Sequence, residues 1–113
     1  MHTPRRSILI DVDQQFATDV RIGLVGEGFD ATTFSSARRA LDALDTIAPD
    51  IILMGDDLSD YDSIDLAERL SHQLEFPVIV LVGNGGAEHL VAHLRAGARD
   101  AIRKPVYLPE LFI

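Results

Sequence analysis

Residues 49–57, which read PDIILMGDD, decide the fold. Four consecutive apolar residues, Ile51–Met54, stand between the Pro49–Asp50 pair and a glycine. An apolar run without alternation is typical of a parallel strand that is covered on both faces. In open parallel sheets, ligands bind beyond the carboxyl ends of the strands. We therefore expect any chemistry of this chain to lie near Gly55, Asp56 and Asp57.

Similar apolar runs recur on both sides of this strand and predict further strands at 7–10, 29–34, 77–82 and 101–102. Residues at helical spacing between the runs predict helices. Their apolar stripes contain Phe16, Val20, Gly23 and Leu24; Ala37, Ala40, Leu41 and Leu44; Leu66, Ala67, Leu70 and Leu74; and Ala87, Leu90, Val91 and Leu94. Ser35 or Ser36 and Asp62 or Ser63 are the expected N-caps of the second and third helices.

Strand and helix alternate about five times, which predicts a doubly wound α/β fold. We expect a (βα)5 three-layer sandwich around a five-stranded parallel sheet, in one domain that spans residues 1–113. Residues 108–113 have the pattern of the first turns of a fifth helix. We therefore expect the chain to stop inside that helix, with more protein after Ile113.

Composition limits the function classes. With 47% hydrophobic residues in 113, the chain can bury a core, and its longest apolar runs are too short to span a bilayer. We expect a soluble, cytoplasmic domain with no membrane contact. A net charge of −8 argues against nucleic-acid binding by this domain, and the lack of cysteine excludes thiolate metal sites and cysteine nucleophiles.

Three short motifs carry a resemblance to a known family. They are Pro49–Asp50 before the central strand, Ala96–Gly97–Ala98 before the last strand, and Lys104–Pro105 after it. In this order and spacing the chain resembles the receiver domain of two-component response regulators, which has a CheY-like, flavodoxin-like fold. The resemblance covers nearly the whole chain. It implies a signalling module that is not an enzyme and that regulates an effector domain, expected after Ile113.

The resemblance also implies that several functional positions have lost their usual residues. The phosphoryl acceptor corresponds to Gly55, the switch threonine or serine to Val82, and the switch aromatic residue to Ala101. The two adjacent carboxylates that hold magnesium correspond to the segment 11–13, which reads DVD, and we expect only Asp13 to match in place. Glycine has no side chain to phosphorylate, and valine has no hydroxyl to bind a phosphoryl oxygen.

The pocket remnants implied by the resemblance are Asp13, Gly55, Val82, Ala101, Lys104 and Pro105. We expect Lys104 to form a structural ion pair with Asp13. Asp13 and Asp57, with help from Asp62, would bind Mg²⁺ weakly or not at all. We therefore expect no cofactor beyond weakly bound Mg²⁺.

The leading hypothesis is a pseudo-receiver that acts without phosphorylation, through a protein partner or a homodimer. By resemblance, its interaction face comprises the fourth helix, fifth strand and fifth helix and includes Glu88, His89, Ala92, His93, Arg95 and Arg103. His89 and His93, four residues apart, are expected to face solvent rather than to bind zinc.

Two alternatives stay open. In the first, a bulge in the central strand makes Asp56 the acceptor of a phosphotransfer protein. Without that bulge, side-chain alternation turns Asp56 away from the site, as a solvated loop carboxylate. In the second, the space between Asp13, Gly55 and Val82 binds a small ligand.

Overall fold

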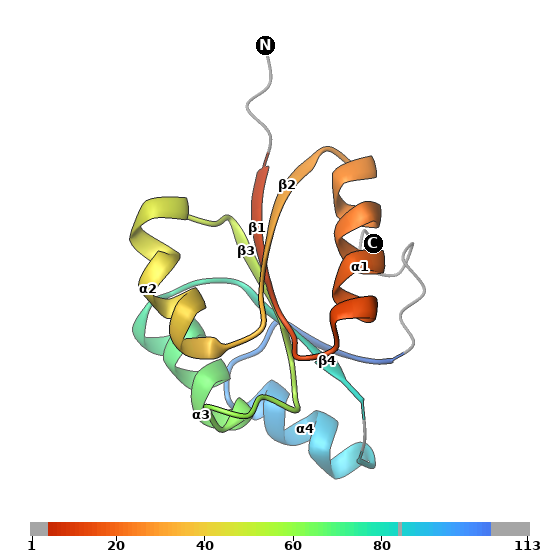
Figure 1. The fold of residues 1–113 in the computed structure, drawn as a ribbon. Coiled ribbons are helices and arrows are strands. Elements are labelled where there is room, and N and C mark those ends of the chain that lie inside the picture. The colour runs from red at the N-terminus through yellow and green to blue at the C-terminus, as the bar shows by residue number, and fades with distance from the viewer. Residues whose placement is uncertain (1–4, 84, 105–113) are drawn as a thin grey trace.

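The computed structural model describes residues 5–83 and 85–104. Five parallel strands form its central sheet in the order β2-β1-β3-β4-β5 (Figure 1). The strands are β1 Arg5–Ile10, β2 Phe29–Phe34, β3 Ile51–Gly55, β4 Val78–Val82 and β5 Asp100–Arg103. The predicted α/β class and parallel sheet are confirmed.

Helices cover both faces of the sheet. They are α1 Gln14–Gly26, α2 Ala37–Ile47, α3 Ser63–Glu68 and α4 Ala87–Arg95, and α3 continues as a π-helical turn, η1 Arg69–Gln73. Helix α1 lies on one face, whereas α2, α3 and α4 lie on the other (Figure 1). The predicted fifth helix at 108–113 and Pro105 lie outside the described residues. None of the helices in the described ranges is long and apolar enough to cross a membrane.

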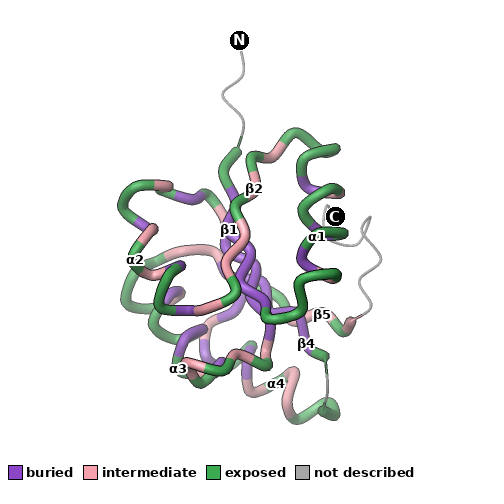
Figure 2. Tube along the Cα trace, viewed as in Figure 1, coloured by how far each residue is buried: buried purple, intermediate pink, exposed green. Residues whose placement is uncertain are grey.

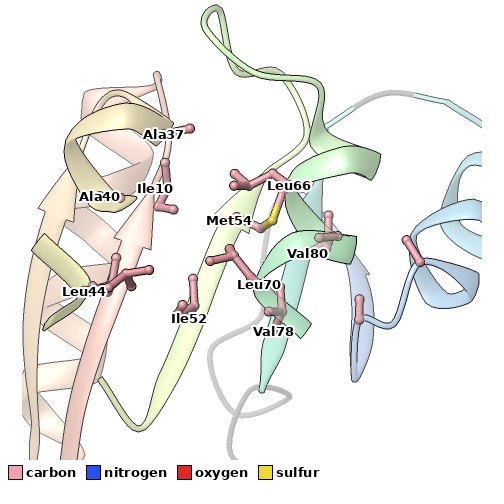
Figure 3. Packing of buried hydrophobic residues seen from close by; sticks show 14 of the residues in the cluster. Ile10, Ala37, Ala40, Leu44, Ile52, Met54, Leu66, Leu70, Val78 and Val80 are labelled. Atoms are coloured by element: carbon pink, nitrogen blue, oxygen red, sulfur yellow. The ribbon is translucent and has the colours of Figure 1, made fainter. Parts of the chain in front are cut away.

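The core has two parts, one on each face of the sheet. Ile8, Ile52 and Val80 pack against α2 and α3, whereas Leu9, Leu53 and Leu81 pack against α1. The central strands β1, β3 and β4 are accordingly the most buried part of the chain (Figure 2), and Figure 3 shows the larger cluster at close range. Each such aliphatic side chain stabilises the fold by about 1.5–3 kcal/mol when fully buried. This double burial explains why the central strands lack polar alternation.

Two helix starts match the expected N-caps. The Ser36 hydroxyl accepts a hydrogen bond from the backbone N–H of Arg39 at 3.3 Å, and Asp62 Oδ1 accepts one from Asp65 N–H at 3.0 Å. These bonds satisfy backbone donors that have no partner inside the first helical turn. The α2 start has a second acceptor, because Asp60 accepts from Ala37 N–H and Arg38 N–H, each at 3.0 Å.

The predicted stripe of α4 is wrong. Val91 and Leu94 are 41% and 43% exposed, and the fully buried residue of this helix is His93. A buried imidazole is tolerated because both of its ring nitrogens have hydrogen-bond partners. Leu74, expected in the α3 stripe, is also exposed, because it follows the π-helical turn η1.

The motif 96–98 allows α4 and η1 to approach closely. Gly97 has φ +110°, and a β-carbon there would lie 2.7 Å from His72 Nε2 and would also meet the Ser71 hydroxyl. The same hydroxyl contacts the carbonyl oxygens of Ala67 at 2.6 Å and Ala96 at 3.1 Å. Only glycine avoids both the strained backbone angle and the collision.

Candidate functional site

The candidate site lies at the carboxyl ends of β1 and β3. These strands are neighbours in the sheet, but the chain leaves β1 toward α1 on one face and β3 toward α3 on the other (Figure 1). Such a reversal of direction opens a crevice beyond the strand ends, where doubly wound proteins bind ligands. The residues at this edge are Asp11, Asp13, Gly55 and Asp56.

Asp11 is the buried carboxylate at this edge. It is 2% exposed, and its Oδ1 accepts a hydrogen bond from Asp13 N–H at 2.9 Å. Its Oδ2 lies 2.8 Å from Lys104 Nζ. No hydrogen bond of good geometry reaches Oδ2 from the described residues, so the ion pair with Lys104 is what offsets the buried charge. The Lys104 ammonium also lies 4.3 Å from the centre of the Phe16 ring, in cation–π geometry.

Two expectations are corrected: that Asp13 is the acidic residue of this site, and that Asp13 pairs with Lys104. Asp13 is exposed and serves as the N-cap of α1, where its Oδ1 accepts from Phe16 N–H at 3.1 Å. Lys104 pairs with Asp11 instead. The reason is local: Asp11 follows β1 directly, where its backbone N–H still bonds to Phe34 O beside the sheet, whereas Asp13 has already turned to cap the helix.

Gly55, the last residue of β3, is buried against the Asp11 carboxylate. A β-carbon at position 55 would lie 2.6 Å from Asp11 Oδ2 and 3.0 Å from its Cγ. Real β-carbons essentially never approach another atom below 3.0 Å. The space next to Gly55, which the ligand-sensor alternative requires to be vacant, thus holds the Asp11 carboxylate.

The two positions expected to lack switch groups are apolar and packed. Val82, at the end of β4, is 1% exposed within the larger core cluster. Ala101, in β5, pairs with Val80 and packs against the same cluster. Neither offers a hydroxyl or a ring at this edge.

The Asp56 side chain is bonded to Gly83 and His89 and is not the solvated carboxylate that was expected. Its side chain is only 7% exposed; Oδ1 accepts from Gly83 N–H at 2.9 Å, and Oδ2 lies 2.9 Å from His89 Nε2. Burial raises the pKa of Asp56, but the hydrogen bonds from Gly83 and His89 outweigh this effect and lower the pKa below its usual value. Asp56 therefore links the β3 end to α4.

The histidine pair continues this link into α3. The His89 and His93 rings meet edge to face at 4.6 Å, and His93 Nδ1 lies 2.8 Å from the carbonyl oxygen of His89. A carbonyl only accepts, so Nδ1 donates, and in the neutral ring Nε2 accepts from the Ser63 hydroxyl at 2.8 Å. The expectation that His93 faces solvent is wrong, since it is 0% exposed.

The residues at this edge do not fit a magnesium site. Mg²⁺ requires near-octahedral oxygen ligands, commonly one or two carboxylates with several waters. Asp11 is already paired with Lys104, Asp13 caps α1, and Asp57 is exposed. Within residues 5–83 and 85–104, no three histidine or acidic side chains are grouped to hold a metal.

The outer surface of α4 remains open. An open hollow over this helix is lined by Ala87, Glu88, Val91, Ala92 and Arg95. Of the residues expected on the interaction face, Glu88, Arg95 and Arg103 are exposed, and His89 and Ala92 are partly exposed. Arg103 Nη1 donates to the carbonyl oxygen of Gly85 at 2.9 Å, which joins β5 to the loop before α4.

Solved structures with the same arrangement are receiver domains and response regulators. A putative response regulator from Chloroflexus aurantiacus is 26% identical, with a TM-score of 0.89 over 97% of this chain and 93% of that one. A CheY-like receiver domain protein from Methanospirillum hungatei is 25% identical, with a TM-score of 0.86 over 97% and 89% of the two chains.

Curated relatives have similar sequences. The DNA-binding response regulator MtrA of Mycobacterium tuberculosis is 33% identical over 112 residues, 98% of this chain and 49% of MtrA. The transcriptional regulatory protein KdpE of the same species is 33% identical over 103 residues, 91% of this chain and 46% of KdpE. The chain thus spans about half the length of these relatives. The family model of the response regulator receiver domain matches residues 8–113, and the chain belongs to this family of two-component signal transduction domains.

Proposed function

We propose that this domain is a pseudo-receiver, which takes no phosphoryl group and is not an enzyme. Gly55 carries the proposal. It closes the β3 strand at the edge where, by family resemblance, the acceptor aspartate stands, and it is packed against another carboxylate. A phosphoryl acceptor must supply a nucleophilic oxygen, which glycine lacks. Val82 and Ala101 add support because neither can act as the hydroxyl or the ring of a receiver switch.

The output of the domain would be protein contact through α4. Val91 and Leu94 are large apolar side chains that remain more than 40% exposed on this helix, next to Glu88 and Arg95. A mixture of apolar area and opposite charges suits a second copy of the chain or a protein partner. We propose that contacts through α4 and β5 regulate an attached output domain.

The relatives suggest which kind of output this is. MtrA is described as a DNA-binding response regulator and KdpE as a transcriptional regulatory protein, and this chain matches about half of each. We therefore propose that the domain serves as the regulatory half of a transcription regulator. With a net charge of −8, the domain would leave DNA binding to the attached half.

Phosphorylation is tested directly with acetyl phosphate or beryllofluoride in the presence of Mg²⁺. We expect an unchanged intact mass and unchanged amide NMR shifts, because no acceptor carboxylate is available. A stable adduct would overturn the proposal, and the modified residue would identify the acceptor. An adduct on Asp56 would establish the phosphotransfer alternative, against which its hydrogen bonds to Gly83 and His89 already weigh.

The α4 surface is tested with a pair of matched variants. Val91→Glu places a charge on α4, and Ile22→Glu places one on α1, where Ile22 is 65% exposed. We expect Val91→Glu to weaken self-association of the full-length protein in analytical ultracentrifugation, and Ile22→Glu to leave it unchanged. If the two variants self-associate equally, α4 is not part of the interface.

A further inference from the structure

We infer that Asp11 replaces the missing acceptor carboxylate and that Lys104 replaces the metal as its counter-ion. The site would then be a structural ion pair that links β1, α1 and the end of β5, rather than a binding pocket. This inference rests on position 55 being unable to accept phosphate, but it does not depend on the partner surface proposed for α4.

The position of the Asp11 carboxylate is the first observation. Its Oδ2 lies 2.6 Å from where the β-carbon of residue 55 would stand. This is close to the distance that separates a carboxylate oxygen from the β-carbon of its own aspartate. The Asp11 oxygen therefore lies about as far from that point as the carboxylate oxygen of an aspartate at position 55 would lie from its own β-carbon.

The charge balance is the second observation. Asp11 is 2% exposed, and a buried carboxylate without a compensating charge is strongly unfavourable. The ammonium of Lys104, 2.8 Å away and with only 20% of its side chain exposed, supplies that charge. A pair that is already neutral has little electrostatic attraction left for Mg²⁺.

The surroundings of Lys104 are the third observation. Its ammonium is held from one side by Asp11 and from another by the Phe16 ring of α1. Lys104 follows β5 directly, and its backbone N–H donates to Val82 O at 2.9 Å. The ion pair therefore fastens β5 to β1 and α1 in one arrangement, with no ligand required.

The first test uses the fact that Lys104 is the only lysine in the chain. Reductive methylation with labelled formaldehyde then reports one side-chain amine, with the α-amino group of the chain as an internal reference. We expect Lys104 to react slowly in the wild type and severalfold faster in Asp11→Asn. Asp57→Asn, which removes an exposed carboxylate at the same edge, should leave the rate unchanged. An equal rate in wild type and Asp11→Asn would overturn the inference.

The second test moves the carboxylate from position 11, directly after β1, to position 55 at the end of β3. We expect Gly55→Asp to lower the melting temperature, because the new side chain collides with Asp11. Gly55→Asp combined with Asp11→Ala should melt higher than Gly55→Asp alone, although it carries one more substitution, and should again protect Lys104 from methylation. Gly55→Asp with Asp11→Asn removes the charge but keeps the volume, so it should melt below the alanine combination.

The inference fails if the alanine combination melts at or below Gly55→Asp alone, or if its Lys104 reacts as fast as in Asp11→Asn. These readouts are separate from those of the proposed function, whose failure would appear as a phosphoryl adduct in the intact mass. A failure of the α4 surface would appear in the association of Val91→Glu, with Lys104 reactivity unaffected.

Discussion

At the scale of single residues, an additional carbon at position 55 would require the Asp11 side chain to move. We expect Gly55→Ala to destabilise the fold by about 1–3 kcal/mol, the usual cost of overpacking a filled site. The added β-carbon would force the Asp11 carboxylate, and with it Lys104, out of place. Urea denaturation measures the loss. Gly26→Ala is the control, since a β-carbon there meets nothing within 4 Å and the variant should not lose stability. Equal stability of the two variants would contradict the crowding described for position 55.

Asp60 makes a second residue-scale prediction, which concerns pH. Backbone hydrogen bonds from Arg38 and Ala37 lower the pKa of Asp60. A lowered pKa in the folded state contributes stability above the unfolded value of about 3.9, and this contribution disappears as pH falls through the folded value. We expect Asp60→Asn, which loses one of two oxygen acceptors for the α2 start, to cost about 0.5–1 kcal/mol at pH 7.

The measurement for Asp60→Asn is the melting temperature from pH 7 down to pH 3. The difference from wild type should shrink as the pH falls below the unfolded value, because the carboxylate then takes up a proton more readily in the unfolded chain than in the folded one. Asp57→Asn, at an exposed position in the loop after β3, serves as the control. A difference that stays constant through acid pH would mean that the charge of Asp60 contributes nothing.

At the scale of elements, α4 is held to α3 by polar contacts inside an apolar core. We expect Ser63→Ala to destabilise the fold by about 1–3 kcal/mol, because Nε2 of the buried His93 would lose its partner. Ser59→Ala, at an exposed serine of the loop before α3, should have almost no effect. Equilibrium unfolding gives the two losses, and histidine nitrogen NMR shows whether the His93 tautomer changes. Equal losses would remove the Ser63–His93 bond from the account of this interface.

Some of these elements were predictable from the sequence and others were not. The central strands were predictable, because a run such as Val78–Val82 has no polar residue and is buried throughout. The inner face of α4 was not, since periodicity counts Val91 and Leu94 as core and cannot anticipate that Ser63, thirty residues away, makes burial of His93 favourable. The π-helical turn after α3 was also missed; its Ser71 hydroxyl contacts the carbonyl oxygen of Ala96, which follows α4 and is twenty-five residues away.

The sequence likewise did not decide which residues occupy the site. The spacing of residues 11–13 allows either carboxylate to enter the pocket. Only the turn from β1 into α1 decides that Asp13 caps the helix while Asp11 stays with the sheet. The sequence itself shows that position 55 has no side chain, but it could not show that Asp11 lies against it, because this contact joins segments that are far apart in the sequence.

At the scale of the whole molecule, we expect Gly55→Asp alone not to create a phosphorylation-driven switch. A switch needs an element with two arrangements that the phosphoryl group favours differently. Val82 cannot bind a phosphoryl oxygen, Ala101 has no ring to move, and Lys104 is already engaged by Asp11. We expect the amide shifts of α4 and the self-association to be the same with and without acetyl phosphate. Phosphorylation-dependent dimerisation of this variant would show that the domain has kept its switch.

Metal dependence is a related whole-molecule prediction. Melting curves of the wild type in millimolar Mg²⁺ and in EDTA should coincide, because the donor set does not fit the ion. The curves of Gly55→Asp should differ, with Mg²⁺ restoring part of the lost stability, since a cation would relieve the repulsion between the carboxylates at positions 11 and 55. A clear upward shift of the wild type in Mg²⁺ would reveal a metal site at this edge.

The crowding between Asp11 and Gly55 also has a consequence for how this sequence can evolve. A mutation that returned a carboxylate to position 55 would first produce a less stable protein, and a mutation that removed Asp11 would first leave Lys104 without its partner. Each path back therefore passes through an intermediate that selection for stability disfavours. A carboxylate could therefore be placed at position 55 without this loss of stability only if position 11 changed with it.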